Sequence, residues 1–186
     1  MTMEDASLFD AAGIQLPRRG TGHSDGHRPR LNVSRELELG KAAEHLACAD
    51  LLLCGWTAYT TDQGLPYDVV VDVGNQLVRV QVKSTFCPKN PQPSNRSTPA
   101  YFFNIRRAGK GGKRTYGESE FDVYALVALD RRAVAYFAVI DLPTSCVVLR
   151  IPGAHYGFTT KQFRTFEGAT FEHALDRLQP ASTATG

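Results

Sequence analysis

The sequence predicts an α/β fold in which helices flank a mixed β-sheet. Three observations lead to this prediction: a valine-rich hairpin around Gly74-Asn75, a helical pattern before it, and further strand-like segments followed by a last helical pattern. With 186 residues, 42% of them hydrophobic, the chain can build one core of ordinary size and has little room for a second.

The two ends of the chain differ in composition from its middle. Residues 1–32 and 179–186 are poor in side chains that could be buried, so we expect a disordered N-terminal arm and a disordered tail. One folded domain, over residues 33–178, remains. No long apolar run predicts a membrane segment, and the cysteines show no Cys-x-x-Cys spacing, so we expect reduced thiols in a cytoplasmic protein.

The first element of the domain is a predicted helix. Ser34 is a plausible N-cap, and Gly55 is a plausible stop signal. Between them an apolar stripe follows helical spacing, formed by Leu39, Ala43, Leu46, Ala47 and Leu53. Glu44 stands beside this stripe, where its carboxylate could reach a site at the edge of the sheet. The alternative is an ordinary surface glutamate.

The remaining elements follow in order along the chain. Beyond the central hairpin, alternation and β-branched residues predict strands, and a helical pattern ends the domain. The predicted strands are 56–61, 66–72, 77–84, 101–105, 121–129, 133–140 and 145–151, and the final helix runs from about 168 to 178.

The central hairpin brings polar groups together. Side chains alternate between the faces of a strand, and Gly74-Asn75 suits a two-residue loop. With that loop Asp68 falls opposite Gln81, and Lys83 stands two residues further along the same face. The other face is almost entirely valine and fit for a buried core.

This trio fits metal-assisted hydrolysis of a phosphodiester. Such chemistry needs hard oxygen ligands for a divalent cation and a positive charge near the attacked phosphate. Asp68 and Gln81 offer oxygens, and Lys83 can orient water or stabilise developing charge. Singly, each has a simpler interpretation: a hairpin-end residue, a sheet amide and an edge-strand charge.

A basic stretch predicts contact with a polyanion. Its cations are interleaved with three glycines: Arg106, Arg107, Lys110, Lys113 and Arg114. Tyr101 and Tyr116 flank it and could stack on bases, although Tyr101 could equally be sheet packing. Ser84 could bond phosphate or backbone. A solvated loop without a partner is the alternative for the basic stretch.

The order of these motifs resembles a known group of enzymes. Gly40-x-x-Ala43-Glu44, Gly55-Trp56, Pro66-Tyr67-Asp68 and Gln81-Val82-Lys83-Ser84 are similar to the motifs of the PD-(D/E)XK nuclease superfamily. The likeness is greatest to the branch with group I intron homing endonucleases and their bacterial and phage relatives. It implies a restriction-endonuclease-like fold.

The resemblance also implies roles for individual residues. Asp68 would be the central metal-binding carboxylate, Glu44 the helix acid and Lys83 the motif lysine. Gln81 stands where Glu or Asp is usual, so the metal would have two formal negative charges around it and a lower affinity. A helix expected after the third core strand is not evident between Phe86 and Phe121.

Together these features predict a metal-dependent DNA endonuclease. Glu44, Asp68 and Gln81 would hold Mg²⁺, for which Mn²⁺ could substitute. One alternative is a non-catalytic DNA-binding module with a degenerate nuclease fold, and another is a nuclease of Holliday junctions or other structured nucleic acids. Cutting both strands usually requires two subunits, so a homo-oligomer, dimer or tetramer, is expected, with the apolar hairpin at 121–140 as one available surface.

Overall fold

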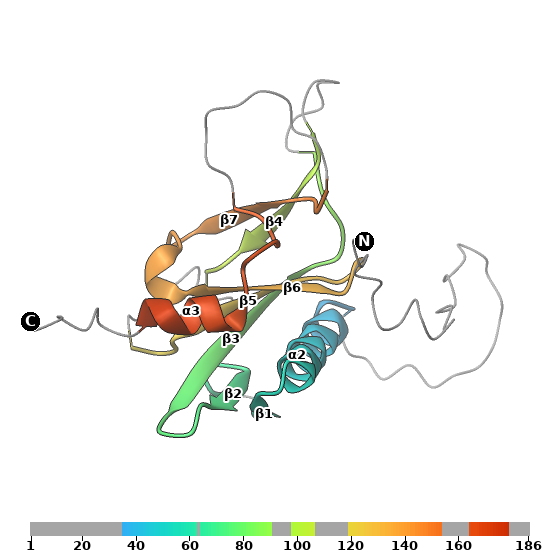
Figure 1. Ribbon diagram of the computed structural model, residues 1–186. Coiled ribbons are helices and arrows are strands. Elements are labelled where there is room, and N and C mark those ends of the chain that lie inside the picture. Colours follow the sequence, from blue (N-terminus) through green and yellow to red (C-terminus); the bar gives the residue numbers. More distant parts are fainter. Residues whose placement is uncertain (1–34, 63, 91–97, 107–118, 154–163, 179–186) are drawn as a thin grey trace, which may run out of the picture. The chain divides into compact units, whose positions relative to one another are not determined.

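The computed structural model describes residues 35–62, 64–90, 98–106, 119–153 and 164–178. The helices and strands within these ranges agree closely with the predicted ones (Figure 1). They are α2 (Arg35–Leu53), β1 (Thr57–Thr60), β2 (Val69–Asp72), β3 (Leu77–Thr85), β4 (Ala100–Asn104), β5 (Val123–Ala128), β6 (Ala133–Ala138), a 3₁₀ turn η1 (Val139–Asp141), β7 (Cys146–Arg150) and α3 (Phe171–Leu178). The predicted N-cap Ser34, arm and tail lie outside the described residues.

Two sheets organise the described strands. The larger has the order β1-β2-β3-β5-β6, and the smaller pairs β4 with β7. Within the larger sheet β3 and β5 run parallel, whereas the other neighbours are antiparallel. The prediction of a mixed sheet with helices is therefore confirmed.

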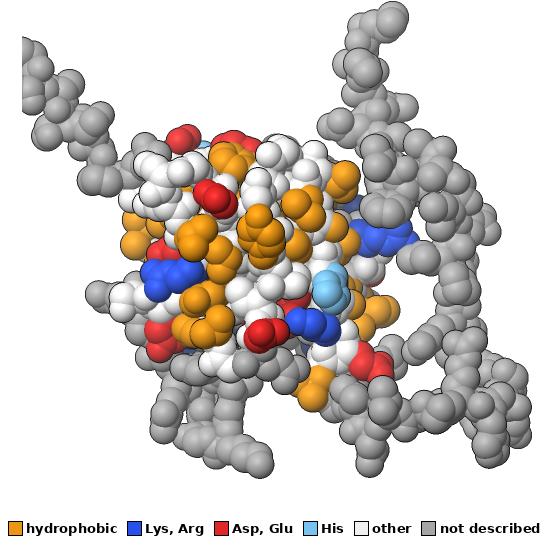
Figure 2. All heavy atoms as spheres, turned by 90° about the horizontal axis from the view of Figure 1, so that it is seen from below, with side chains coloured by type: hydrophobic (Ala, Val, Ile, Leu, Met, Phe, Trp, Pro, Cys, Tyr) orange, Lys and Arg blue, Asp and Glu red, His pale blue; other side chains and the backbone are white. Residues whose placement is uncertain are grey.

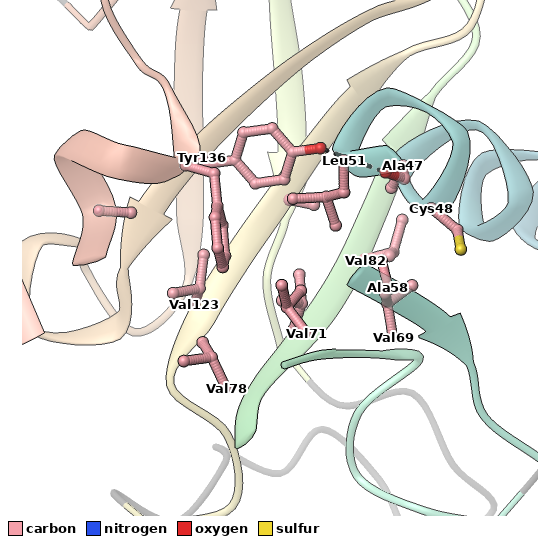
Figure 3. Close-up of a cluster of buried hydrophobic side chains, with 14 of the residues drawn as sticks. Ala47, Cys48, Leu51, Ala58, Val69, Val71, Val78, Val82, Val123 and Tyr136 are labelled. Carbon is pink, nitrogen blue, oxygen red and sulfur yellow. Dashed lines mark hydrogen bonds between the residues drawn. The ribbon is translucent and has the colours of Figure 1, made fainter. Parts of the chain in front are cut away.

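Each face of the five-stranded sheet is covered by different elements. Helices α2 and α3 contribute Ala43, Ala47, Leu51 and Phe171 to a core with the sheet valines. Figure 3 shows part of this core, with Leu51 and Ala47 of α2 above the valines. On the other face, β4 and β7 form a second core with β5 and β6, whose buried members include Tyr101, Phe103, Val147, Leu149, Tyr124 and Leu126.

Helix α2 ends as its sequence predicts. Gly55 has a φ of +89°, its amide donates to the Leu52 carbonyl, and the Trp56 amide donates to the Leu51 carbonyl. These two bonds form a Schellman motif, which needs a residue in the left-handed region. The prediction that Leu53 belongs to the apolar stripe is wrong: Leu53 is 66% exposed, and Leu51 occupies the buried position instead.

The central hairpin has the predicted register. Val71 pairs with Val78, and the Val73 amide donates to the Gln76 carbonyl across the turn. The Asp72 carboxylate accepts a bond of 2.8 Å from the Gly74 amide, so this acid stabilises the turn. Val69, Val71, Val78, Val80 and Val82 are all buried in the core under α2.

The connection between β3 and β5 departs from the family pattern that the motifs suggest. Its described residues contain β4 and no helix, and β4 pairs with β7 in the separate sheet. The chain thus covers this face of the larger sheet with a two-stranded ribbon. The parallel pairing of β3 with β5 nevertheless extends from Val80↔Val123 to Thr85↔Ala128.

The apolar hairpin at 121–140 is not an open surface. All residues of β5 are buried, and β6 packs against α3. Apart from the exposed Ile140, its hydrophobic side chains are buried or partly buried in the cores of this chain. This corrects the prediction that the hairpin offers a broad apolar surface to a second subunit.

The turn end of the β2–β3 hairpin borders a groove. Trp56, Val73, Gln76, Leu175 and Leu178 are among the residues that line it. Figure 2 looks at the molecule from below, the side on which the β2–β3 turn lies in Figure 1, and shows hydrophobic side chains interrupted by polar ones. Asp68 and Gln81 lie at the other end of the hairpin.

Neither described helix is long and apolar enough to cross a membrane.

A buried hydrogen bond joins α2 to the far edge of the sheet. The Tyr136 hydroxyl of β6 donates to the Asp50 carboxylate over 2.8 Å, and it also lies near the Ala47 carbonyl (Figure 3). Burial raises the pKa of Asp50, and this hydrogen bond partly offsets the rise. The ionised carboxylate therefore depends on Tyr136 for its solvation.

Replacing Tyr136 by Phe should destabilise the protein by about 1–2 kcal/mol at neutral pH, because the half-buried carboxylate would lose its donor. The pKa of Asp50 is raised on folding, so its protonation favours the folded state. A protonated Asp50 depends less on the hydroxyl donor. The loss of stability caused by Tyr136→Phe should therefore decrease as the pH falls and Asp50 becomes protonated.

Urea unfolding of wild type and Tyr136→Phe at several pH values measures this effect. Tyr59→Phe is a matched control, because Tyr59 is 60% exposed and should change stability by less than about 0.5 kcal/mol. An equal loss for both variants at neutral pH would contradict the assigned role of Tyr136.

Candidate active site

Asp68 lies at the start of the β2–β3 hairpin and is anchored by the opposite strand. Its backbone amide donates to the Val80 carbonyl, and its Oδ2 accepts a bond of 2.8 Å from the Val82 amide. The same oxygen accepts a hydrogen bond from the Gln81 side-chain amide. Within the described part of the chain no hydrogen bond reaches Oδ1, so this oxygen is available to a ligand.

Among the described residues, Gln81 is the one buried side chain that carries an amide or a charge, with 7% of its surface exposed. Its Nε2 donates to Asp68 and lies 3.2 Å from the Val82 carbonyl. A buried amide needs such partners, because an unpaired polar group is costly away from water. With Nε2 used in both bonds, Oε1 remains as an acceptor beside the Asp68 carboxylate.

Lys83 and Ser84 follow on the same strand but on opposite faces. Lys83 shares the face of Gln81, and its charge lowers the pKa of Asp68. Ser84 shares the face of Val80 and Val82, and it is half-buried. The structure thus brings Lys83 into the electrostatic surroundings of Asp68, as predicted, and turns Ser84 toward the helix side.

Glu44 approaches from α2. Its carboxylate raises the pKa of Asp68, which places the two acids within electrostatic reach of each other. Glu44 itself forms an ion pair with Lys41, 2.7 Å between Oε2 and Nζ. The side chains of Lys41 and Glu44 are 42% and 21% exposed. Small neighbours on α2, Ala43 and Ala47, are fully buried, so the helix lies close to the sheet that carries Asp68.

Opposing effects act on the pKa of the Asp68 carboxyl group. Burial raises the pKa of its carboxyl above the ordinary value, and the nearby Glu44 carboxylate raises it further. The Val82 amide and the cations of Lys83 and Lys41 lower it. A cation bound between the two acids would relieve this repulsion and favour the ionised form of Asp68.

The donor set fits a hard divalent cation. Asp68 Oδ1, Gln81 Oε1 and the Glu44 carboxylate are oxygens, and Mg²⁺ prefers oxygen ligands and keeps several of its waters. No group of three or more His, Cys, Asp and Glu side chains in the described ranges is arranged to hold a metal. The set predicted from the sequence, Glu44, Asp68 and Gln81, has two carboxylates and one amide instead of three acids. A cation there would polarise the phosphate and lower the pKa of bound water.

An ion pair fixes the strand that carries Gln81. The Arg79 guanidinium binds the Asp122 carboxylate through Nε and NH2 at 3.0 and 2.8 Å, and the Arg79 amide donates to the same carboxylate. Asp122 directly precedes β5. This bidentate contact therefore locks β3 against its parallel neighbour two residues before Gln81.

The predicted nucleic-acid contacts have different outcomes. Arg106 is exposed just beyond β4, and its contact with nucleic acid stays a prediction. The others in the basic stretch and beside it, Arg107, Lys110, Lys113, Arg114 and Tyr116, lie outside the described residues.

The prediction that Tyr101 stacks on bases is corrected by the structure. Tyr101 is fully buried, and its hydroxyl lies 3.0 Å from each oxygen of Asp130. Burial and the Asp130 carboxylate raise the pKa of Tyr101 to about 12. Its ring is core packing and is not accessible to a base.

Two cationic features escaped the sequence analysis. Lys41 carries no motif signal, although its spacing of three residues from Glu44 on a helix could have indicated the contact. Arg131 and Arg132 form the β5–β6 turn, where Leu129 and Asp130 donate to the carbonyls of Thr85 and Phe86. This turn therefore lies beyond the same end of β3 that carries Lys83.

The comparisons with known proteins agree with this geometry. A family model described as PD-(D/E)XK endonuclease matches residues 35–167. The fold is similar to that of a solved bacterial homing endonuclease, I-Ssp6803I, with a TM-score of 0.53 and 24% sequence identity over 69% of this chain and 86% of that one. No match was found among curated protein sequences.

The matched residues include α2, the central hairpin and the parallel β3–β5 pair, and hence every residue of the candidate site. On this match the chain belongs to the PD-(D/E)XK endonuclease family.

Proposed function

We propose that the protein is a Mg²⁺-dependent endonuclease that hydrolyses phosphodiester bonds of DNA by an activated water, with Mn²⁺ able to replace Mg²⁺. The observation that carries this proposal is the hydrogen-bonded pair of the half-buried Asp68 and the buried Gln81 at the open end of the hairpin. Lys83 shares the strand face of Gln81, and the charges of Glu44 and Lys83 both act on Asp68. Family membership supports nuclease chemistry at this place.

Each residue of the site has a distinct task in this proposal. Asp68, Glu44 and Gln81 hold the cation, and the strand bonds to Val82 keep the Asp68 carboxylate oriented. Lys83 orients the attacking water or stabilises the charge that develops on the phosphate. With only two carboxylates, the site favours one cation over two.

The cellular setting and assembly are also part of the proposal. All four cysteines are free thiols, which fits a reducing compartment such as the cytoplasm. Each chain has one small site, and cutting both strands of a duplex calls for two. We therefore propose a homo-oligomer, a dimer or tetramer, as the active form.

Asp68→Ala and Lys83→Ala should each reduce nicking of supercoiled plasmid by at least about 100-fold, because one removes a ligand and the other a charge that acts in the transition state. Both variants should remain folded in a thermal melt. Asp72→Ala is the matched control: it removes an acid from the same strand face, but that acid bonds only the turn amide of Gly74. Full cleavage by both site variants would refute the assignment.

Gln81→Glu separates the proposed enzyme from a non-catalytic DNA-binding module. The new carboxylate would lose both donated hydrogen bonds and face Asp68, so the metal-free protein should melt at a lower temperature than wild type. Mg²⁺ or Mn²⁺ should restore more stability to Gln81→Glu than to wild type, because the added charge raises metal affinity.

A non-catalytic DNA-binding module predicts a different result in the plasmid assay. A non-catalytic module would leave plasmid intact in wild type under every Mg²⁺ and Mn²⁺ concentration while still binding DNA in a salt-sensitive way. That result would replace the proposed endonuclease by the binding module.

We propose that the β5–β6 turn contacts DNA phosphate. Arg131 is exposed and Arg132 is partly exposed, and the turn that contains them lies beyond the end of β3 that carries Lys83. Removing two phosphate contacts should reduce the slope of log affinity against log salt by about two.

Binding of a duplex at several salt concentrations measures this slope for Arg131→Ala/Arg132→Ala. The control is Arg164→Ala/Arg177→Ala, because both of those arginines bind Asp141, beyond the opposite end of β6. Equal slopes for wild type and the turn variant would exclude the turn from the interface.

A further inference from the structure

The ion pair of Lys41 with Glu44 is not the arrangement that best stabilises a helix. It precedes Glu44 by three residues, and helices gain more from the reverse order, with the acid nearer the N-terminus, because the helix dipole favours that arrangement. Exposed pairs of this kind contribute little to stability. The 2.7 Å contact nevertheless places the Lys41 ammonium on a carboxylate of the proposed metal site.

The electrostatic surroundings of Lys41 come from three separate segments. Glu44 is its nearest partner on α2, Asp68 lies on the hairpin, and Asp62 lies in the loop after β1. All three carboxylates act on this one ammonium group. Lys41 thus binds Glu44 directly and lies within electrostatic reach of Asp68, two of the residues whose oxygens fit a divalent cation.

We propose that Lys41 is the internal counter-ion of the metal site: it neutralises Glu44 in the metal-free protein, competes with the cation for that carboxylate, and is released to contact DNA phosphate when the cation binds. This inference rests on the proposed function. The inference extends that function, because metal binding and DNA binding would both depend on the Lys41 side chain.

The chemistry of lysine suits such an exchange. Its ammonium is a compact charge on a flexible stem, and 42% of the side chain is exposed, so it can move from Glu44 to a ligand at the surface without unfolding α2. A divalent cation carries twice its charge and displaces it from the carboxylate oxygen. Gln81 favours this exchange. A site with two acids binds the cation less tightly than a site with three, so Lys41 can compete with the cation for Glu44.

The first test is Mn²⁺ binding to the DNA-free protein, followed by the electron paramagnetic resonance signal of free Mn²⁺. Lys41→Met should bind Mn²⁺ about fivefold more tightly than wild type, because a competing charge has been removed. Lys41→Arg retains the charge and should bind less tightly than Lys41→Met. Arg177→Met is the matched control. It removes a cation of α3 that is paired with Asp141 of η1, so it should leave the Mn²⁺ affinity unchanged.

The second test measures duplex binding under two conditions, with Ca²⁺ and with a metal chelator. Ca²⁺ is used because, like Mg²⁺, it prefers oxygen ligands. With Ca²⁺, Lys41→Met should show a salt slope smaller by about one than wild type. In the chelator the two slopes should be equal, because Lys41 is then paired with Glu44.

The outcomes separate this inference from the proposed function. Unchanged or weaker Mn²⁺ binding by Lys41→Met, together with loss of Mn²⁺ binding by Asp68→Asn, would overturn the counter-ion role and leave the metal site in place. A wild-type protein that binds no Mn²⁺ would overturn both. Thermal melts of every variant confirm that the comparison is between folded proteins.

Discussion

The register of the β2–β3 hairpin is the constraint on which the rest of the site depends. The Gly74-Asn75 turn places Val71 opposite Val78, and the same ladder places Asp68 beside Gln81. A slip by one residue would move every valine from the core to the other face, so the hydrophobic core and the site enforce the same pairing. Packing under α2 therefore holds the polar end of the hairpin in place.

A second layer of contacts makes this hairpin part of a rigid sheet. Arg79 binds Asp122 at the entrance to β5, and the parallel pairing continues to Thr85. The β5–β6 turn thereby lies near the end of β3 that bears Lys83. On the other side, Tyr136 joins the sheet to α2, the helix that carries Glu44 and Lys41. The acids thus come from two elements whose separation is set by buried contacts.

The charge balance of the site follows from its unusual amide. With Gln81 in place of an acid, two carboxylates remain, and Lys41 and Lys83 bring two positive charges into their surroundings. Such a site is close to neutral without a metal, which allows Asp68 to be half-buried. The same balance would weaken the binding of the proposed cation and make it more responsive to nearby charges, among them DNA phosphate and lysine side chains.

The sequence by itself determined the order of elements, the hairpin register and the polar trio, because strand alternation and a two-residue turn are local rules. It could not determine which residues meet across the fold. The burial of Tyr101, the approach of Glu44 and Lys41 on α2 to Asp68, and the position of the β5–β6 turn beyond the end of β3 depend on how α2, β4 and β5 pack on the sheet. Those are long-range contacts, and no local pattern encodes them, so only the tertiary structure decided them.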